Sequence, residues 1–233
     1  KDSISFPRGW TRPGLSMMDR SGIKYEIEDH RRTLDPIELE FRGTLRPYQE
    51  QAVKDVLRRD FGILDCPTGG GKTVMCLAVI AERRQPTLVL VHNKELLHQW
   101  AERIRSFLGI EPGLIGDGQF EIQSVTVATT QTARKHLDEL PQHFGFVIGD
   151  EIHRVPAMQY AEVIQAFDSR FMLGLSATPF RRDGLSRLIY ILMGDRVHQV
   201  DAGELRSNGA VLAPEIIRRE TAFRYQYSDD YPK

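Results

Sequence analysis

The sequence predicts an α/β fold, a mainly parallel sheet with helices on both faces. Short and predominantly apolar segments of strand length alternate with segments in which apolar residues recur at helical spacing. Strands that are apolar on both faces need cover on both sides, and the helical crossovers between parallel strands supply it. The expected strands are residues 61–65, 87–91, 124–130, 144–148 and 171–176.

Composition agrees with one large folded domain and its extensions. The 233 residues are 41% hydrophobic and 27% charged, as is usual for a soluble protein that builds a core. With 31 basic and 32 acidic side chains, the net charge is −1. Any binding of nucleic acid must therefore come from a local patch of the surface.

Cysteine spacing and hydropathy exclude several classes. Cys66 and Cys76 lack the C-x-x-C spacing of zinc sites, and two cysteines form no disulfide framework. Both observations are typical of a reducing compartment, and we expect a cytoplasmic protein. Residues 1–20 carry several charges and do not form a signal peptide. No apolar run approaches the ~20 residues of a membrane helix, so no membrane association is expected.

Helix signals separate the expected strands. Pro47 lies in the first turn of a helix that runs to Leu57, and Asn93 can cap the helix that ends at Leu108. Further helices are expected at 74–84, at 157–167 and, as a short piece, before Pro141. Residues 109–119, which hold four glycines and a proline, are expected to form a loop.

Residues 1–42 are interpreted as a lead-in or as the remnant of a preceding domain. They are rich in Pro, Gly and Arg, and their apolar residues are few. Ile23, Tyr25 and Ile27 alternate with polar residues, which indicates one strand at most.

A glycine-rich turn connects the first expected strand to its helix, and this is the context that a phosphate-binding loop requires. Backbone N–H groups and the helix N-terminus can bind a polyphosphate, Lys72 can reach the outer phosphates, and the Thr73 hydroxyl can ligate Mg²⁺. Cys66 occupies the first glycine position of the pattern and is interpreted as a tolerated variant, and secondarily as a thiol whose alkylation would block ATP binding. The candidate ATP-binding residues of the loop are Pro67, Thr68, Gly69, Gly70, Gly71, Lys72 and Thr73.

Acidic residues follow the fourth expected strand. Asp150 is placed to hold Mg²⁺ together with Thr73, and Glu151 to orient or deprotonate an attacking water. Because the carboxyl ends of parallel strands share one edge, both should lie near the loop. Lys72 and Glu151 are the candidate catalytic residues. His153, taken alone, would be interpreted as a surface or capping histidine.

Six motifs in order resemble motifs Q, I, Ia, Ib, II and III of superfamily 2 helicases, over residues 43–205. They are RPYQ, CPTGGGKT, VHNKELLHQW, VATTQ, DEIH and SAT. Within that superfamily, GLSATPFRRDG and FPRGW resemble the XPB-type DNA helicases and their bacterial and phage relatives. Where XPB-type proteins have Arg-Glu-Asp, this chain has Arg181-Arg182-Asp183, with a base in place of the middle acid.

The resemblance implies the first of two RecA-like domains, with ATP and Mg²⁺ as cofactors. Arg46 and Gln49 would contact the adenine, and His153, Ser176 and Thr178 would couple the nucleotide state to the nucleic-acid groove. The residues that would donate to nucleic-acid phosphates are Asn93, Lys94, Thr130, Gln131 and Arg181.

A second RecA-like domain is expected as a partner, with residues 206–233 as the linker toward it. The residues after Thr178 hold no Q-x-x-G-R-x-x-R pattern such as the family's motif VI, which carries arginine fingers. Because such arginines accelerate phosphoryl transfer about 10³-fold or more, the chain alone should hydrolyse ATP poorly.

The preferred function is therefore the motor domain of an ATP-dependent DNA helicase or translocase. DNA, as opposed to RNA, rests on the resemblance alone. Three alternatives stay open: the motor subunit of a restriction or defence system, a small-molecule kinase with a phosphate-binding loop, and a nucleotide-gated binding module without catalysis.

Overall fold

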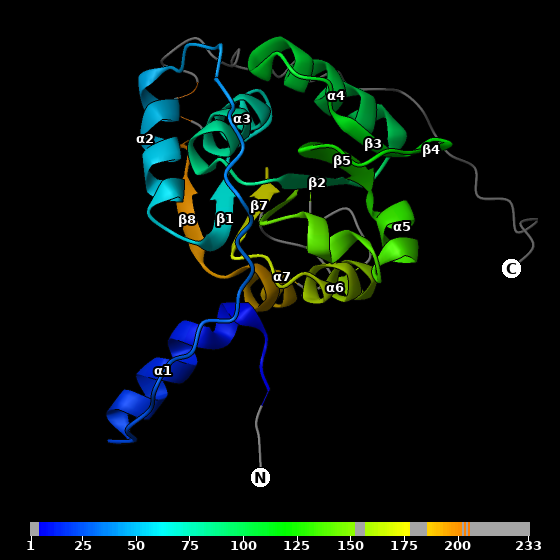
Figure 1. Cartoon of the computed structure of the whole chain (residues 1–233). Coiled ribbons are helices and arrows are strands. Elements are labelled where there is room, and N and C mark those ends of the chain that lie inside the picture. The colour runs from blue at the N-terminus through cyan, green and yellow to red at the C-terminus, as the bar shows by residue number, and fades with distance from the viewer. Residues whose placement is uncertain (1–4, 152–156, 178–185, 202, 204, 206–233) are drawn as a thin grey trace, which may run out of the picture.

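A computed structural model describes residues 5–151, 157–177, 186–201, 203 and 205 (Figure 1). These residues form an eight-stranded sheet in the order β4-β3-β5-β2-β6-β7-β1-β8. All paired strands are parallel except β3 and β4. The strands are β1 (Phe61–Asp65), β2 (Thr87–Val91), β3 (Gly113–Gly116), β4 (Gln119–Phe120), β5 (Val125–Thr129), β6 (Phe146–Gly149), β7 (Phe171–Ser176) and β8 (Arg196–Gln199).

Helices cover both faces of this sheet (Figure 1). On one face α2 (Pro47–Leu57), α3 (Lys72–Arg83) and α4 (Lys94–Leu108) enclose one hydrophobic core. On the other face α5 (Thr130–Ala133), α6 (Ala157–Ala166) and α7 (Ser186–Met193) enclose a second. The predicted α/β class, with its mainly parallel sheet, is confirmed.

Short 3₁₀ segments complete the described part of the chain, at Arg8–Trp10, Arg134–His136 and Leu140–His143.

The predicted loop at 109–119 is wrong, because it contains β3 and the start of β4. A Cβ atom on Gly113 would lie 2.5 Å from the Glu121 carbonyl oxygen and 2.6 Å from Thr126 Oγ1. Glycine is therefore needed for close approach of neighbouring backbone, and the same glycine lowers the strand signal. The edge strand β8 was also missed, since its sequence Arg-Val-His-Gln is mostly polar.

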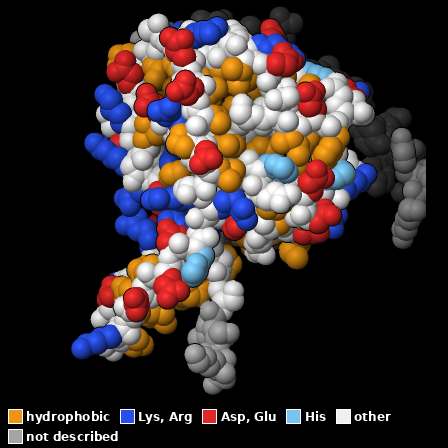
Figure 2. All heavy atoms as spheres, in the orientation of Figure 1, with side chains coloured by type: hydrophobic (Ala, Val, Ile, Leu, Met, Phe, Trp, Pro, Cys, Tyr) orange, Lys and Arg blue, Asp and Glu red, His pale blue; other side chains and the backbone are white. Residues whose placement is uncertain are grey.

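The lead-in forms a helix, α1 (Thr11–Arg20), which projects away from the sheet (Figure 1). The strand considered at 23–27 is absent from these described residues. Ile23, Tyr25 and Ile27 are instead 55%, 40% and 63% exposed. Apolar side chains are visible along this projecting part of the surface (Figure 2).

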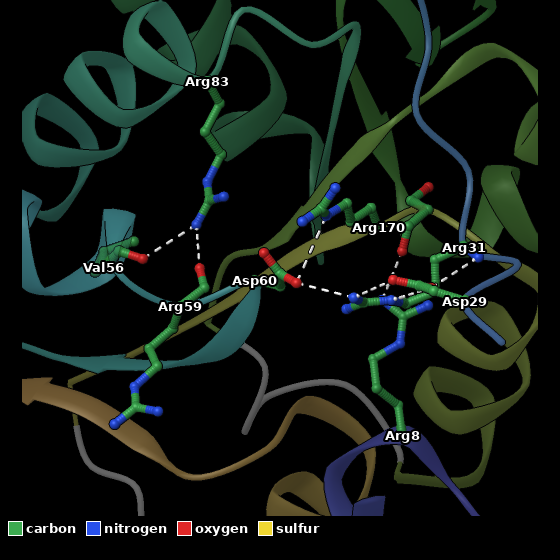
Figure 3. Close-up of polar contacts among 9 residues, drawn as sticks. Arg8, Asp29, Arg31, Val56, Arg59, Asp60, Arg83 and Arg170 are labelled. Carbon is green, nitrogen blue, oxygen red and sulfur yellow. Dashed lines mark hydrogen bonds and ion pairs between the residues drawn. The ribbon is translucent and has the colours of Figure 1, made fainter. Parts of the chain in front are cut away.

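Arginines fasten the lead-in to the amino edge of the sheet, the edge opposite the glycine-rich loop. Arg8 donates to the Ser169 carbonyl oxygen at 2.6 Å. Asp60 lies immediately before β1. Its Oδ2 forms ion pairs with Arg31 Nη2 at 2.9 Å and with Arg170 Nε at 3.5 Å (Figure 3).

The later part of the lead-in crosses the C-terminal ends of two helices. The Ile37 amide donates to the carbonyl of Arg84 at 2.8 Å, directly after α3. The Arg42 amide donates to the carbonyl of Phe107 at 2.7 Å, in the last turn of α4. Carbonyls at helix ends have no partner within the helix, and the lead-in supplies one to each.

Arg83 connects α3 to the end of α2. Its Nη2 donates to the carbonyls of Val56, at 3.0 Å, and Arg59 (Figure 3). Its guanidinium lies over the ring of Phe171, 4.2 Å from the centroid. Burial lowers the pKa of Arg83 to about 10, which leaves the side chain charged at neutral pH. These contacts hold the C-terminal ends of α2 and α3 together.

Candidate nucleotide-binding site

The candidate site lies at the carboxyl edge of the sheet, where three neighbouring strands end. The glycine-rich loop follows β1, and Asp150 follows β6. Between these two strands lies β7, whose last residue, Ser176, is in register with Asp65. The Cys66 amide donates to the Ser176 carbonyl at 2.9 Å. The loop is thus attached to the adjacent strand at its first residue.

The glycines of the loop are required by backbone angles and by close neighbours. Gly69 and Gly71 have φ values of 84° and 82°, in the left-handed region that favours glycine. A Cβ atom on Gly70 would lie 2.4 Å from Cys66 Sγ, and one on Gly71 would lie 2.3 Å from Gln49 Nε2. Only glycine fits at either position, which agrees with the prediction of a tight phosphate-binding turn.

Lys72 begins α3 and lies at the mouth of the loop. Its Nζ donates to the Cys66 carbonyl at 2.9 Å and lies 3.9 Å from Glu151 Oε1. Both side chains are largely buried, with 12% and 17% of their surface exposed. Thr73, the next residue of α3, is half-buried, whereas Thr68 lies on the exposed side of the loop. The two predicted catalytic side chains are therefore neighbours.

Glu151 has an unusual backbone conformation. Its φ is 50°, which is costly for a residue with a Cβ atom. Strained residues of this kind cluster at functional sites. Glu151 is the second residue after β6, and its carboxylate meets Lys72 at this point.

The first turn of α2 is attached to the glycine-rich loop through Gly70. The buried side chain of Gln49 donates from Nε2 to the Gly70 carbonyl at 3.3 Å, and its Oε1 accepts from the Arg46 amide at 2.9 Å. Tyr48 donates to the same Gly70 carbonyl at 3.1 Å. Both ends of the Gln49 amide thus have partners within the protein, and the Arg46 side chain is exposed.

Tyr48 was missed by sequence reasoning. Its position next to Gln49 in the Arg-Pro-Tyr-Gln stretch was the available signal.

Asp150 is held by two hydrogen bonds. Its amide donates to the Leu90 carbonyl at 2.8 Å, and its Oδ2 accepts from Trp100 Nε1 at 2.8 Å. The residues are 7% and 1% exposed. Burial raises the pKa of the Asp150 carboxyl, and the indole hydrogen bond opposes that rise. Trp100 was predicted only as a core position of α4, because helical spacing does not reveal a hydrogen bond.

The oxygen donors at this edge fit Mg²⁺. Thr73 offers a hydroxyl and Asp150 a carboxylate, both hard ligands. Mg²⁺ is usually bound by one or two carboxylates together with substrate phosphates and water. Among the described residues, no group of three or more His, Cys, Asp or Glu side chains could hold a metal ion without such help. The donor set thus suits a cation that arrives with a phosphate ligand.

The predicted nucleic-acid contacts divide into two kinds. Asn93 caps α4, with its side chain accepting from the Leu96 amide at 2.9 Å. Thr130 is buried and donates to the Val91 carbonyl at 3.1 Å. Lys94 and Gln131 are exposed at the starts of α4 and α5. Of these four side chains, two stabilise helix starts and two face outward.

Three predicted site residues, His153, Thr178 and Arg181, lie outside the described residues, as do 206–233.

Cys66 is buried, and burial raises the pKa of its thiol to about 11. A thiol that is protonated at neutral pH is a poor nucleophile. The geometry therefore argues against alkylation of Cys66 as a simple means of blocking nucleotide binding. Cys66 and Cys76 are both free thiols.

The mainly parallel sheet and its carboxyl-edge loop are those of a RecA-like α/β domain. The chain belongs to the ResIII family, described as type III restriction enzyme, res subunit, which matches residues 42–181. The predicted resemblance to XPB-like superfamily 2 proteins, within the first RecA-like domain, is confirmed by that match and by the relatives given next.

Two relatives show the level of similarity. The chain is 37% identical over 186 residues to the DNA 3'-5' translocase XPB2 of Sulfurisphaera tokodaii, covering 78% of this chain and 42% of the relative. It is 34% identical over 185 residues to the probable helicase D10 of Escherichia phage T5, covering 78% and 41%. The chain thus spans less than half the length of these relatives.

Solved structures share the fold. The UvsW helicase from bacteriophage T4 matches with a TM-score of 0.63 and 23% identity, over 82% of this chain and 78% of that one. A SWI2/SNF2 ATPase core from Sulfolobus solfataricus, in complex with double-stranded DNA, matches with a TM-score of 0.57 and 20% identity, over 69% and 38%.

Family membership implies the use of ATP. It also argues against the alternative that the chain is a small-molecule kinase. Among the described residues, no helix is both long and apolar enough to cross a membrane.

Proposed function

We propose that this chain is the ATP-binding motor domain of an ATP-dependent DNA helicase or translocase, in which ATP hydrolysis is coupled to movement on nucleic acid. The observation that carries the proposal is the convergence of Lys72, Glu151 and Asp150 at the edge where the glycine-rich loop lies. The pair Lys72–Glu151, at 3.9 Å, supports a single site for phosphate binding and hydrolysis.

The proposed role of each residue in binding and hydrolysing ATP follows from its chemistry. Lys72 and the amides of Gly69, Gly70 and Gly71 bind the β- and γ-phosphates. Thr73 and Asp150 hold Mg²⁺, which when bound neutralises charge on the phosphate oxygens. Glu151 accepts a proton from the attacking water and orients it. In the absence of nucleotide, Glu151 and Lys72 partner each other, and a bound γ-phosphate competes for the ammonium group.

The base of the nucleotide lies beside the start of α2, near Arg46 and Gln49. Because Gln49 donates to the carbonyl of Gly70, a contact at the adenine is transmitted to the phosphate loop. Ser176, His153 and Thr178 communicate the nucleotide state to the neighbouring strand ends. The Cys66 amide donates to the Ser176 carbonyl, so Ser176 lies beside the first residue of the glycine-rich loop.

Nucleic acid runs along the same edge, and phosphate contacts would suffice to hold it. Lys94 and Gln131 are the exposed donors, and Asn93 and Arg181 complete the track. Thr130 lies beside Gln131, but it is buried and its hydroxyl donates to the Val91 carbonyl. The names of the relatives support DNA as the substrate. A second RecA-like domain in the full-length protein supplies the remaining catalytic arginine, so that the chain alone hydrolyses ATP slowly.

The proposal is tested by nucleotide binding to the chain itself. A fluorescent ATP analogue with Mg²⁺ should bind the wild type, and Lys72→Ala should weaken binding about 100-fold, as expected for loss of a charge-assisted contact to phosphate. Lys54→Ala, on the exposed side of α2, is the matched control. Equal affinity of Lys72→Ala and wild type would overturn the proposal. ATPase assays of the full-length protein with single-stranded DNA, duplex DNA and RNA identify the stimulating nucleic acid.

A second candidate function is the motor subunit of a restriction or defence system. It is favoured by the family's own description as the res subunit of type III restriction enzymes. The two candidates share the motor and differ in what it is joined to. Cleavage of DNA that depends on ATP, by the full-length protein, identifies the restriction system, and translocation without cleavage identifies the helicase.

A further inference from the structure

Trp100 connects α4 to the metal-binding carboxylate. It is buried among core residues, yet its one polar atom, Nε1, donates to Asp150 Oδ2 at 2.8 Å. It lies about two helical turns after Asn93, the N-cap of the same helix. The Trp100 side chain therefore joins α4, the helix that begins at the proposed nucleic-acid track, to the proposed Mg²⁺ ligand.

The chemistry of the contact determines how the carboxylate is presented. An indole N–H donates and cannot accept, so it selects an oxygen lone pair of the Asp150 carboxylate. With Oδ2 bound to the indole, Oδ1 is the oxygen that can turn toward a cation or its water. Hydrogen bonds to a charged acceptor are stronger than neutral ones, and groups that orient metal ligands change metal affinity 10- to 100-fold.

The backbone of Asp150 adds a second constraint. Its amide donates to the Leu90 carbonyl at the end of β2, which leaves the side-chain torsions as the remaining freedom. Trp100 removes that freedom, since its ring is enclosed by the core between α4 and the sheet. The carboxylate is thereby fixed from two elements, β2 and α4.

We propose that Trp100 is a positioning residue for Asp150, and that through it α4 sets the orientation of the Mg²⁺-binding carboxylate. The inference rests on the proposed function of Asp150. Its consequence is that a shift of α4 on nucleic-acid binding, at Asn93 and Lys94, moves Asp150 as well. The Trp100 link thus offers a physical route by which nucleic acid alters the ATPase site.

The test separates positioning from packing by comparing nucleotide affinity with and without Mg²⁺. Trp100→Phe keeps most of the ring and removes the N–H donor. We expect the increase in affinity on adding Mg²⁺ to a fluorescent ATP analogue to fall about tenfold, while affinity in EDTA changes little. Trp10→Phe is the matched control, since Trp10 packs on Phe6 in the lead-in. A variant with a purely structural defect would lose affinity equally under both conditions.

A double-mutant cycle gives the second arm. If Trp100 acts through Asp150, the effects of Trp100→Phe and Asp150→Asn on the Mg²⁺-dependent increase are not additive. Additive effects, or an unchanged increase in Trp100→Phe, would overturn the inference and leave the proposed function standing. Absence of Mg²⁺-dependent nucleotide binding by the wild type would overturn both.

A third arm requires no change at Trp100. The chain has two tryptophans, so in Trp10→Phe the remaining tryptophan fluorescence comes from Trp100. We expect Mg²⁺ added to the ATP-bound protein to change this emission, and Asp150→Asn to abolish the change. Emission that does not respond to Mg²⁺ contradicts the inference even if Trp100→Phe fails to fold.

Discussion

Lys72 Nζ lies 3.9 Å from Glu151 Oε1, so the predicted phosphate-binding cation and the predicted base form an ion pair. Both side chains are largely buried, and the pairing of opposite charges offsets part of the cost of removing each from water. Lys72 follows β1 and Glu151 follows β6. Their ion pair therefore also holds the glycine-rich loop close to the acidic residues after β6. A γ-phosphate bound at this loop would therefore lie near both the cation and the base.

Glu151→Gln should slow ATP hydrolysis about 10²- to 10⁴-fold while changing nucleotide affinity only a few-fold. The amide keeps the shape of the side chain and loses the ability to accept a proton from water. Steady-state hydrolysis and analogue binding are measured on the same preparation. Glu102→Gln, on the exposed side of α4, serves as the control, and equal hydrolysis by Glu151→Gln and this control contradicts the assigned role.

Gly71→Ala should abolish nucleotide binding. The new methyl group would meet Gln49 Nε2 at 2.3 Å, in a backbone conformation with φ of 82°. Gly118→Ala is a matched control, because Gly118 has φ of 83° and open space around it. Both variants carry the left-handed strain, but only the first displaces the Gln49–Gly70 contact. Similar nucleotide affinity in the two variants would show that this contact has no bearing on the site.

Arg83→Met should lower the free energy of unfolding by about 2 kcal/mol. The substitution removes the guanidinium that donates to the Val56 and Arg59 carbonyls and stacks on Phe171. Denaturant unfolding measures the loss. Arg103→Met, at an exposed position of α4, is expected to change stability by less than about 0.5 kcal/mol.

Stability should depend on pH through the pair Asp55–His198, which joins α2 to β8 at 2.9 Å. The hydrogen bond from His198 lowers the pKa of Asp55 below its ordinary value. A carboxyl with a lowered pKa stabilises the fold at pH values above about 3.9 and loses that effect as the pH falls through the folded pKa. The stability difference between wild type and Asp55→Asn should therefore be present at neutral pH and disappear in acid. A difference that grows below about pH 4 contradicts this sign.

Sequence reasoning worked best where the pattern was apolar. The strands β1, β2 and β7 have the predicted bounds, since each is buried and bordered by clear turn or helix signals. It failed at β3, where glycines required by close neighbours imitate a loop, and at β8, a polar edge strand. It also failed at α1, where Pro13 and Gly14 lie in the first half of the helix and are typical of a loop.

The candidate site shows the same division. Motif order was enough to predict that Lys72, Asp150 and Glu151 lie at one edge, because parallel strands end together. The partners that hold these residues were not predicted. Trp100 and Tyr48 have the spacing of core positions, and only the three-dimensional arrangement reveals that each donates a hydrogen bond toward the site.

The lead-in crosses the C-terminal ends of α3 and α4. This crossing determines where the N-terminus of a shortened domain can be placed. The lead-in amides at Ile37 and Arg42 satisfy carbonyls at the ends of two helices that begin at the candidate site. A protein shortened to start at the first recognisable motif, near Leu45, would expose both helix ends and uncover the aromatic stack of Phe41 on Phe107. For expression and crystallisation, the smallest sensible unit therefore starts upstream of Ile37, ahead of where motif boundaries alone would place it.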